Sequence, residues 1–294
     1  QTCALPIYKE GKVEPHFRKW RKHYLIGTHI GWDFSNNTEI LKRTKPDFYL
    51  SSFSHLTNDI PKDMVIELNA RNFLPNHFDY NKKDKNTLLE AIDVMNKSSS
   101  TKISEDLINE IKESNNENIW DIIWVNRPST IKKPKSFLDN VKKLFENYGK
   151  FKVLIISAYT NLEKKDTSRK DHFDIVGYVN KKFTSEEKKF ISILRPYGGG
   201  PLGIDNKYVA PFYIWSKSYA FYTELEGDAR SLHEALCCNC YVVHYKHLKG
   251  AGKDYLRSDN SFSFDNYNES YKSLYESIMS DKKIDIEFIQ EKCF

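Results

Sequence analysis

The sequence predicts an α/β protein built on parallel sheets, and three observations support this. Short runs rich in β-branched and aromatic residues recur along the chain, as expected for buried strands. Stretches with helical spacing separate these runs, and strands that alternate with helices are typical of βαβ units. The chain is 39% hydrophobic and 14% aromatic, which indicates a globular protein, and its 294 residues suit one large or two medium domains.

The overall composition limits the classes of function. A net charge of +5 permits anionic ligands or a membrane surface, but it is too mild to predict a nucleic-acid partner. No apolar run approaches the roughly 20 residues needed to span a bilayer. Cysteines without an evident pairing fit a reducing compartment. We therefore expect a cytoplasmic protein, with peripheral contact at a membrane surface left open.

The first 80 residues predict an incomplete domain. Residues 1–7, QTCALPI, resemble the translation of a sequencing adaptor, and we expect them to be non-native. Strands are expected at 23–28, 47–52 and 64–68, separated by polar or turn-forming sequence. Residues 8–80 are therefore assigned to an N-terminal domain that is too short to be whole.

The rest of the chain predicts an inter-domain region and a second domain. Residues 81–117 are highly polar, although apolar spacing at 103–111 predicts a helix there. A second domain is expected at 118–265, followed by a helical segment at 266–294. In these two parts, strands are expected at 119–125, 152–157, 173–178, 221–223, 241–243 and 262–264, and helices at 136–147, 210–220 and 267–279.

The stretch 223–245 carries the densest set of functional side chains. Glu226 and Glu234 lie eight residues apart, which on one helix is about 80° off alignment and about 12 Å of rise, so they would not converge. We expect a loop that carries Glu226 and turns into a helix N-terminus near 229–231, with Glu234 inside the helix. The free backbone N–H groups at such a helix start suit a phosphate, Gly227 permits close approach, and Arg230 adds positive charge. Two ordinary surface acids are the alternative.

A second anion site is predicted where the strand at 119–125 leads into basic sequence and then a helix. Arg127 lies just after the strand, and Lys132 or Lys133 precedes the helix. Positive side chains beside a helix N-terminus attract anions. A solvated helix start is the alternative.

Two further patterns need an interpretation. Cys237, Cys238 and Cys240 lie near three histidines, but the second ligand pair of a zinc site is missing. We therefore expect no metal, and packing of the thiols at a helix-to-strand junction is the alternative we favour. The glycine-rich run at 198–203 lacks the Lys-Ser/Thr ending of a phosphate loop, so we expect a flexible loop, with a lid over a cleft left open.

The central stretch also carries a family resemblance. Residues 226–236 fit E-G-x-x-x-S-L-x-E-A-L, which resembles the EX7E region of GT-B retaining glycosyltransferases, especially glycosyltransferase family 4. The chain departs from the family pattern at Ala229, where a second glycine is usual, and at 239–241, where Gly-x-Pro is usual.

Two other segments resemble the same family, in the family's order. Arg127 and Lys132 keep the offset of an Arg and a Lys that grip the donor diphosphate, with Asn126 in place of a glycine. His29 resembles a histidine at the end of a strand on the acceptor side, although the spacing is one residue short. A structural histidine is the alternative.

The resemblance implies a GT-B fold of two Rossmann-like domains with parallel sheets. Residues 8–80 would be the remnant of the acceptor-side domain, and 118–265 would bind the nucleotide sugar. The implied enzyme is a glycosyltransferase, which moves a sugar from a nucleotide diphosphate to an acceptor hydroxyl with retention, and without a metal or other cofactor. The acceptor would be a saccharide, a lipid-linked molecule or a protein.

The resemblance also implies the roles of single residues. Glu226, which would contact the donor sugar, and His29 are the catalytic candidates, while Glu234 would bind the ribose hydroxyls. The donor-binding candidates are Arg127, Lys132, Glu226, Gly227, Arg230, Ser231, Leu232 and Glu234. Two alternatives stay open: a GT-B sugar-nucleotide epimerase, and a non-catalytic module that binds anions or a membrane surface.

Overall fold

The structure is a computed structural model of the chain. It describes residues 26–29, 48–51, 65–67, 77–115, 118–157, 173–196, 205–226, 230–250 and 252–293. The glycine-rich run at 198–203, the expected non-native residues 1–7 and Gly227 lie outside the described residues.

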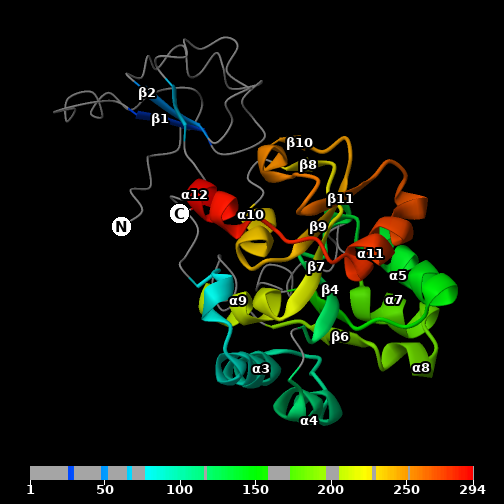
Figure 1. The fold of residues 1–294 in the computed structure, drawn as a ribbon. Helices are drawn as coiled ribbons and strands as arrows, with labels where there is room; N and C mark the ends of the chain where they lie inside the picture. Colours follow the sequence, from blue (N-terminus) through cyan, green and yellow to red (C-terminus); the bar gives the residue numbers. More distant parts are fainter. Residues whose placement is uncertain are drawn as a thin grey trace, which may run out of the picture.

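A six-stranded, all-parallel sheet organises the larger part of the chain (Figure 1). Its order, β11-β9-β7-β4-β5-β6, is the arrangement in which the first strand in sequence lies at the centre and the chain then builds outward on either side. The parallel sheet confirms the predicted α/β class. Its strands are β4 Trp120–Val125, β5 Val153–Ile156, β6 Ile191–Leu194, β7 Ser216–Phe221, β9 Tyr241–Tyr245 and β11 Ser261–Phe264.

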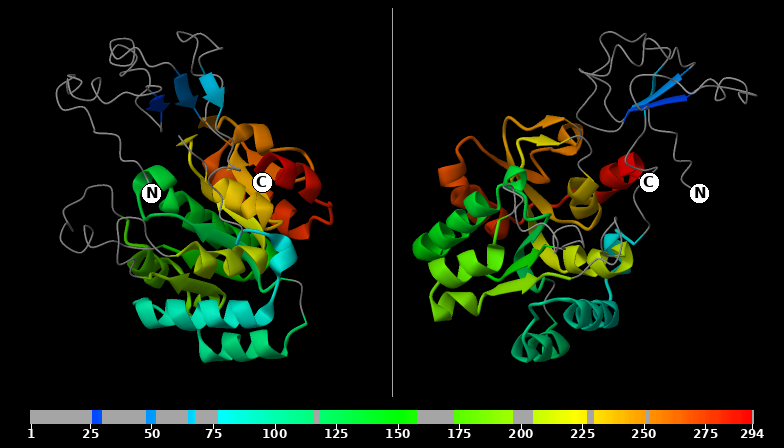
Figure 2. Two further views of the ribbon diagram at one scale, coloured as in Figure 1. Left: turned by 90° about the vertical axis from the view of Figure 1, so that its left-hand side faces the viewer. Right: turned by 180° about the vertical axis from the view of Figure 1, so that it is seen from behind.

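Helices cover both faces of this sheet, as Figures 1 and 2 show. Side chains alternate between the faces along each strand, so Leu154 and Ile156 belong to one buried cluster and Val153 and Ile155 to the other. A parallel sheet with both faces buried gives strands that are apolar throughout. The helices are α3 Lys85–Ser98, α4 Glu105–Glu113, α5 Pro134–Tyr148, α7 Ile175–Lys182, α8 Ser185–Lys188, α9 Asn206–Ile214, α10 Arg230–Cys237, α11 Ser270–Met279 and α12 Ile286–Cys293.

The helices α3 and α4 belong to the same core as the sheet. Leu88, Ile92 and Met95 of α3 are buried in one cluster with Phe212 of α9 and Trp120 of β4. Figure 2 shows α3 and α4 together beneath α9. On the other face α11 packs against α5, whereas α12 lies beside α10 on the same face as α3 and α9.

Smaller elements complete the described fold. The strands β1 Ile26–His29, β2 Phe48–Ser51 and β3 Val65–Glu67 form a separate parallel sheet in the order β1-β2-β3, which matches the three strands expected there. The strands β8 Leu225–Glu226 and β10 Lys249–Gly250 pair in parallel. Short 3-10 turns occur at η3 Tyr80–Lys82, η4 Thr130–Lys132, η5 Lys253–Tyr255 and η6 Tyr267–Glu269.

Three predicted elements are wrong: the strand at 173–178, the helix at 210–220 and the separate strand at 221–223, of which only Phe221 lies in a strand, as the last residue of β7. Residues 173–178 do not form a strand, because Asp174 caps a helix, α7, by accepting a hydrogen bond from the Gly177 backbone N–H at 3.0 Å. The helix predicted at 210–220 ends at Ile214, and β7 begins at Ser216. Pairing of β7 with β4 and β9 on either side outweighs its weak strand pattern.

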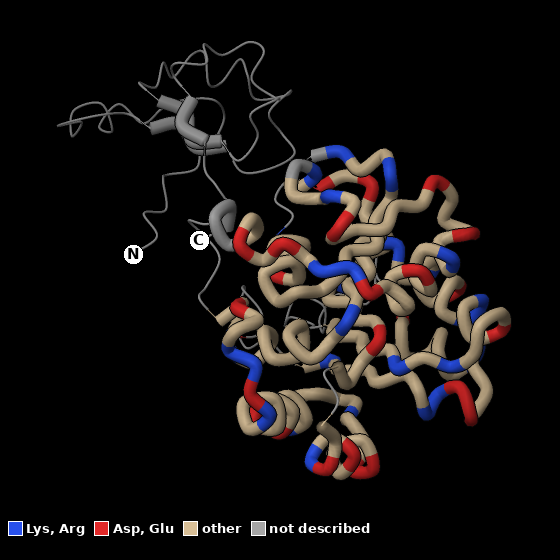
Figure 3. The backbone as a smooth tube through the Cα atoms, viewed as in Figure 1, with Lys and Arg blue, Asp and Glu red and all other residues tan. Residues whose placement is uncertain are grey.

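Positive and negative side chains are interspersed over the described part of the chain (Figure 3). Lys and Arg alternate with Asp and Glu there (Figure 3), and several lysines pair with a nearby acid, such as Lys135 with Asp139 and Lys189 with Glu186. Within the part of the chain that the structure describes, no helix combines the length and apolar character needed to cross a membrane.

Candidate functional site

The topology of the six-stranded sheet indicates where a ligand would bind. The chain runs from β4 outward to β5 and β6, then returns to β7 on the opposite side of β4. Neighbouring strands whose connections leave in opposite directions form a switch point, and ligands of such sheets bind outside the carboxyl ends of the strands there. In this protein the switch point lies between β4 and β7, which pair in register at Ile123 and Tyr219.

The loop after β4 brings the predicted cations to this edge. Arg127 is exposed and lies two residues beyond the strand. Lys132 is the last residue of η4, and Lys133 has a left-handed backbone with φ 54° that joins η4 to α5. The two lysines are therefore at the N-terminus of α5, where the helix dipole favours negative charge.

The loop after β7 meets this basic segment. The Lys132 ammonium donates a hydrogen bond to Glu226 Oε2, and both side chains are mostly buried, with 21% and 14% of their surface exposed. The Lys133 ammonium lies 2.9 Å from Glu224 Oε1. Two segments that are 94 residues apart in sequence thus converge at the switch point.

The helix α10 begins directly beyond, at Arg230. Arg230 Nε donates to Glu234 Oε1 at 3.1 Å, and the Glu234 side chain is 10% exposed. The Leu232 side chain is buried in the core, so this residue would contact a ligand only through its backbone. The predicted change from a loop to a helix near 229–231 agrees with this geometry.

A buried tyrosine that sequence reasoning missed joins the two loops. The Tyr219 hydroxyl donates to Ser231 Oγ at 2.9 Å, and it accepts a hydrogen bond from Asn126 Nδ2 at 3.3 Å. Burial raises the pKa of Tyr219, so the hydroxyl stays protonated. The sequence pattern predicts a helix at 210–220, so it gives no reason to expect Tyr219 at the site.

The remaining candidates are His29 and the three clustered cysteines. His29 is the last residue of β1, the strand end at which it was expected; the structure does not describe its side chain, and its catalytic role stays a prediction. The side chains of Cys237, Cys238 and Cys240 are buried and form no disulfide, and the Cys240 thiol donates to Tyr213 O at 3.1 Å. Burial raises the pKa of the Cys238 and Cys240 thiols. Among the described residues, no group of three or more His, Cys, Asp or Glu side chains is arranged to hold a metal.

Comparison with known proteins gives matches at the level of structure. No protein-family model matches the chain, and no curated protein matches it by sequence. A glycosyltransferase from Rickettsia africae has a similar structure, with a TM-score of 0.58 and 16% identity over 94% of this chain and 67% of that one. Sucrose-phosphate synthase from Thermosynechococcus elongatus gives a TM-score of 0.55 and 11% identity, over 95% of this chain and 65% of that one.

A third similar structure is the pneumococcal O-GlcNAc transferase GtfA, solved with UDP and GlcNAc. It gives a TM-score of 0.54 and 9% identity, over 92% of this chain and 47% of that one. This chain thus spans from 47% to 67% of the lengths of the three proteins. At such low identity the likeness concerns the fold: the chain has the α/β fold of GT-B glycosyltransferases.

Proposed function

We propose that this chain is the donor-binding part of a retaining glycosyltransferase that uses a nucleotide-diphosphate sugar and needs no metal. One observation carries the proposal: Lys132 and Glu226, both expected from the sequence to bind the donor, meet at the switch point of the sheet. The resemblance of the fold to sugar transferases supports the same reaction.

The chemical task is to stabilise a departing diphosphate beside an electron-poor sugar. Negative charge grows on the diphosphate as the sugar leaves, and fixed cations and N–H groups placed around it lower the barrier. Arg127, Lys132 and Arg230 supply the cations, and the N-termini of α5 and α10 supply partial positive charge. This set of groups would neutralise a diphosphate without a divalent ion.

The ion pairs define a resting state for the site. Lys132 is held by Glu226 and Arg230 by Glu234, so these two cations already have an anionic partner. A diphosphate would take the place of these carboxylates on the cations. Glu226 would then be free to contact the donor sugar and Glu234 to accept hydrogen bonds from the ribose hydroxyls.

The first test is calorimetric titration in the presence of EDTA. UDP, GDP, ADP and their sugars are titrated into the wild-type protein and into Lys132→Ala and Arg127→Ala, with UDP-GlcNAc included because GtfA was solved with UDP and GlcNAc. We expect one nucleotide to bind, and Lys132→Ala to weaken it about tenfold or more, because a hydrogen bond to a charged group contributes about 1.5–3 kcal/mol. Lys135→Ala is the matched control, since Lys135 pairs with Asp139 on an exposed part of α5, the helix that follows Lys132.

The other outcomes separate the alternatives. No binding by a folded wild-type sample would contradict the proposal and favour a module that binds other anions. Conversion of the nucleotide sugar to an epimer without an acceptor would favour an epimerase. Transfer with retention would appear in NMR spectra as a product with the same anomeric configuration as the donor.

A further inference from the structure

Tyr219 lies at the point where the two halves of the site meet. Its ring is fully buried in the core on β7, packed against Tyr213 with ring centroids 5.6 Å apart. Only its hydroxyl reaches the carboxyl edge of the sheet, where it contacts Asn126 on the loop after β4 and Ser231 on α10.

The hydrogen atoms of this cluster can be assigned one by one. Asn126 Nδ2 can only donate, so the Tyr219 oxygen accepts from it. The single Tyr219 proton has Ser231 Oγ at 2.9 Å and the Val125 carbonyl at 3.4 Å, and the shorter contact is the better hydrogen bond. The Ser231 oxygen therefore acts as an acceptor toward Tyr219.

This assignment leaves the Ser231 proton available. A hydroxyl has one proton, and among the described residues no acceptor for it is found. Ser231 is the second residue of α10, next to Arg230, where backbone N–H groups and the helix dipole also favour an anion. A ligand with several acceptor oxygens, such as a diphosphate, fits beside these donor groups.

We propose that Tyr219 is a positioning residue of the donor site. By donating to Ser231 it orients the serine O–H toward the diphosphate, and the hydrogen bond that it accepts from Asn126 keeps Tyr219 in this donating role. The inference rests on the proposed function, because it assigns a role within the same site. Tyr219 itself does not touch the ligand.

A double-mutant cycle tests this role. Tyr219→Phe, Ser231→Ala and the double variant are titrated with whichever of UDP, GDP and ADP the wild type binds, and with the corresponding nucleoside. We expect Ser231→Ala to weaken the diphosphate about tenfold and Tyr219→Phe to weaken it about threefold or more. The double variant should bind as Ser231→Ala does, because Tyr219 acts through Ser231. Affinity for the nucleoside should stay unchanged, whereas a general structural defect would lower both.

The titrations distinguish failure of the proposed function from failure of the role assigned to Tyr219. If the wild type binds no nucleotide, the proposed function and the role of Tyr219 are both overturned. If the wild type binds but Tyr219→Phe has the same diphosphate affinity, or if the two losses add in the double variant, only the role of Tyr219 is overturned. Should Tyr219→Phe not fold, Asn126→Ala replaces it, and undiminished diphosphate affinity in that variant contradicts the proposal.

Discussion

Among single residues, Glu226 has two opposed effects in the proposed site. As the partner of Lys132 it would compete with a diphosphate for the ammonium group, whereas the proposed transfer places it beside the sugar. We predict that Glu226→Gln binds a nucleoside diphosphate more tightly, by about fivefold, because a hydrogen bond to a charged acceptor contributes roughly 1 kcal/mol more than one to a neutral acceptor. Sugar transfer should fall by a much larger factor. Calorimetry and a transfer assay on the same sample measure both effects.

Glu224→Gln is the matched control for this prediction. Glu224 pairs with Lys133 in the same loop, but its side chain is half exposed. We expect a smaller change in affinity and little change in transfer. Weaker diphosphate binding by Glu226→Gln would show that Glu226 does not compete for Lys132.

His233 gives a prediction about acid stability. Its ring is buried against Tyr255, neither ring nitrogen has a hydrogen-bond partner among the described residues, and burial lowers its pKa to about 4. The unfolded chain protonates this residue near pH 6.5, so between about pH 6.5 and 4 the unfolded state binds more protons. The free energy of unfolding therefore falls as the pH drops through this window.

Replacement of His233 should remove this part of the acid sensitivity. In urea unfolding at pH 7 and 4.5, we expect the loss of stability to be about 2 kcal/mol smaller in His233→Leu than in the wild type. His247→Leu changes an exposed histidine and should leave the wild-type difference in place. An equal loss in His233→Leu and the wild type would mean that the buried ring does not set the pH dependence.

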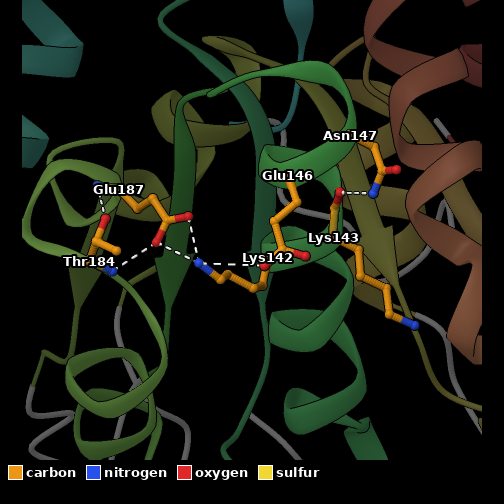
Figure 4. Close-up of polar contacts among 6 residues, drawn as sticks. All are labelled: Lys142, Lys143, Glu146, Asn147, Thr184 and Glu187. Atoms are coloured by element: carbon orange, nitrogen blue, oxygen red, sulfur yellow. Dashed lines mark hydrogen bonds and ion pairs between the residues drawn. The ribbon is translucent and has the colours of Figure 1, made fainter.

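At the scale of elements, the Glu187 carboxylate links α8 to α5 through an ion pair with Lys142. Glu187 completes a capping box with Thr184 at the start of α8, and it accepts hydrogen bonds from the Lys142 ammonium of α5 at 2.7 and 2.9 Å (Figure 4). Burial raises the pKa of Glu187, but the hydrogen bonds from Lys142 and Thr184 outweigh this, and the net pKa is lowered. The stabilisation is thus present above the pKa of the unfolded chain and is lost as the pH falls through the folded value.

Glu187→Gln should test this attachment, since the amide oxygen still accepts from the backbone but carries no charge. We expect a free energy of unfolding lower by about 1 kcal/mol at pH 7, and a difference that shrinks as the pH falls below the ordinary glutamate pKa and is lost through the lowered pKa of the folded state. The neighbouring Glu186 forms an exposed pair with Lys189, so Glu186→Gln should give no measurable change. A Glu187→Gln difference that persists at low pH would argue against an ionic contribution.

The helices and strands also show which parts of the fold the sequence pattern can predict. β4, α5, β9 and α11 were predicted because their apolar spacing agrees with their final burial. β7 was missed because Ser216–Phe221 has a weak strand pattern, and pairing on both sides decides its state. The meeting of Lys132 with Glu226 follows from the family resemblance, whereas Tyr219 could not be found, since its role depends on that strand and on a contact across the sheet.

For the whole molecule, the two clusters of buried side chains define the cooperative unit. Phe78, Leu88, Ile111 and Phe212 belong to one cluster, and together the two clusters cover both faces of the six-stranded sheet. The boundary predicted within 81–117 divides a region whose helices α3 and α4 pack in this core. The stable unit that carries the proposed site therefore includes α3 and α4.

Two fragments would test where this unit begins. We predict that residues 77–294 unfold in one cooperative transition and bind nucleotide within about threefold of the full chain, because both core clusters are retained. Residues 118–294 lack α3 and α4 and would expose Phe212 and Tyr213 of α9, so we expect poor solubility or a much lower melting temperature. Circular dichroism, size-exclusion chromatography and calorimetry compare the two. If residues 118–294 were as stable as 77–294, α3 and α4 would be an accessory to the unit, and the packing of Leu88, Ile92 and Met95 against α9 would contribute little to its stability.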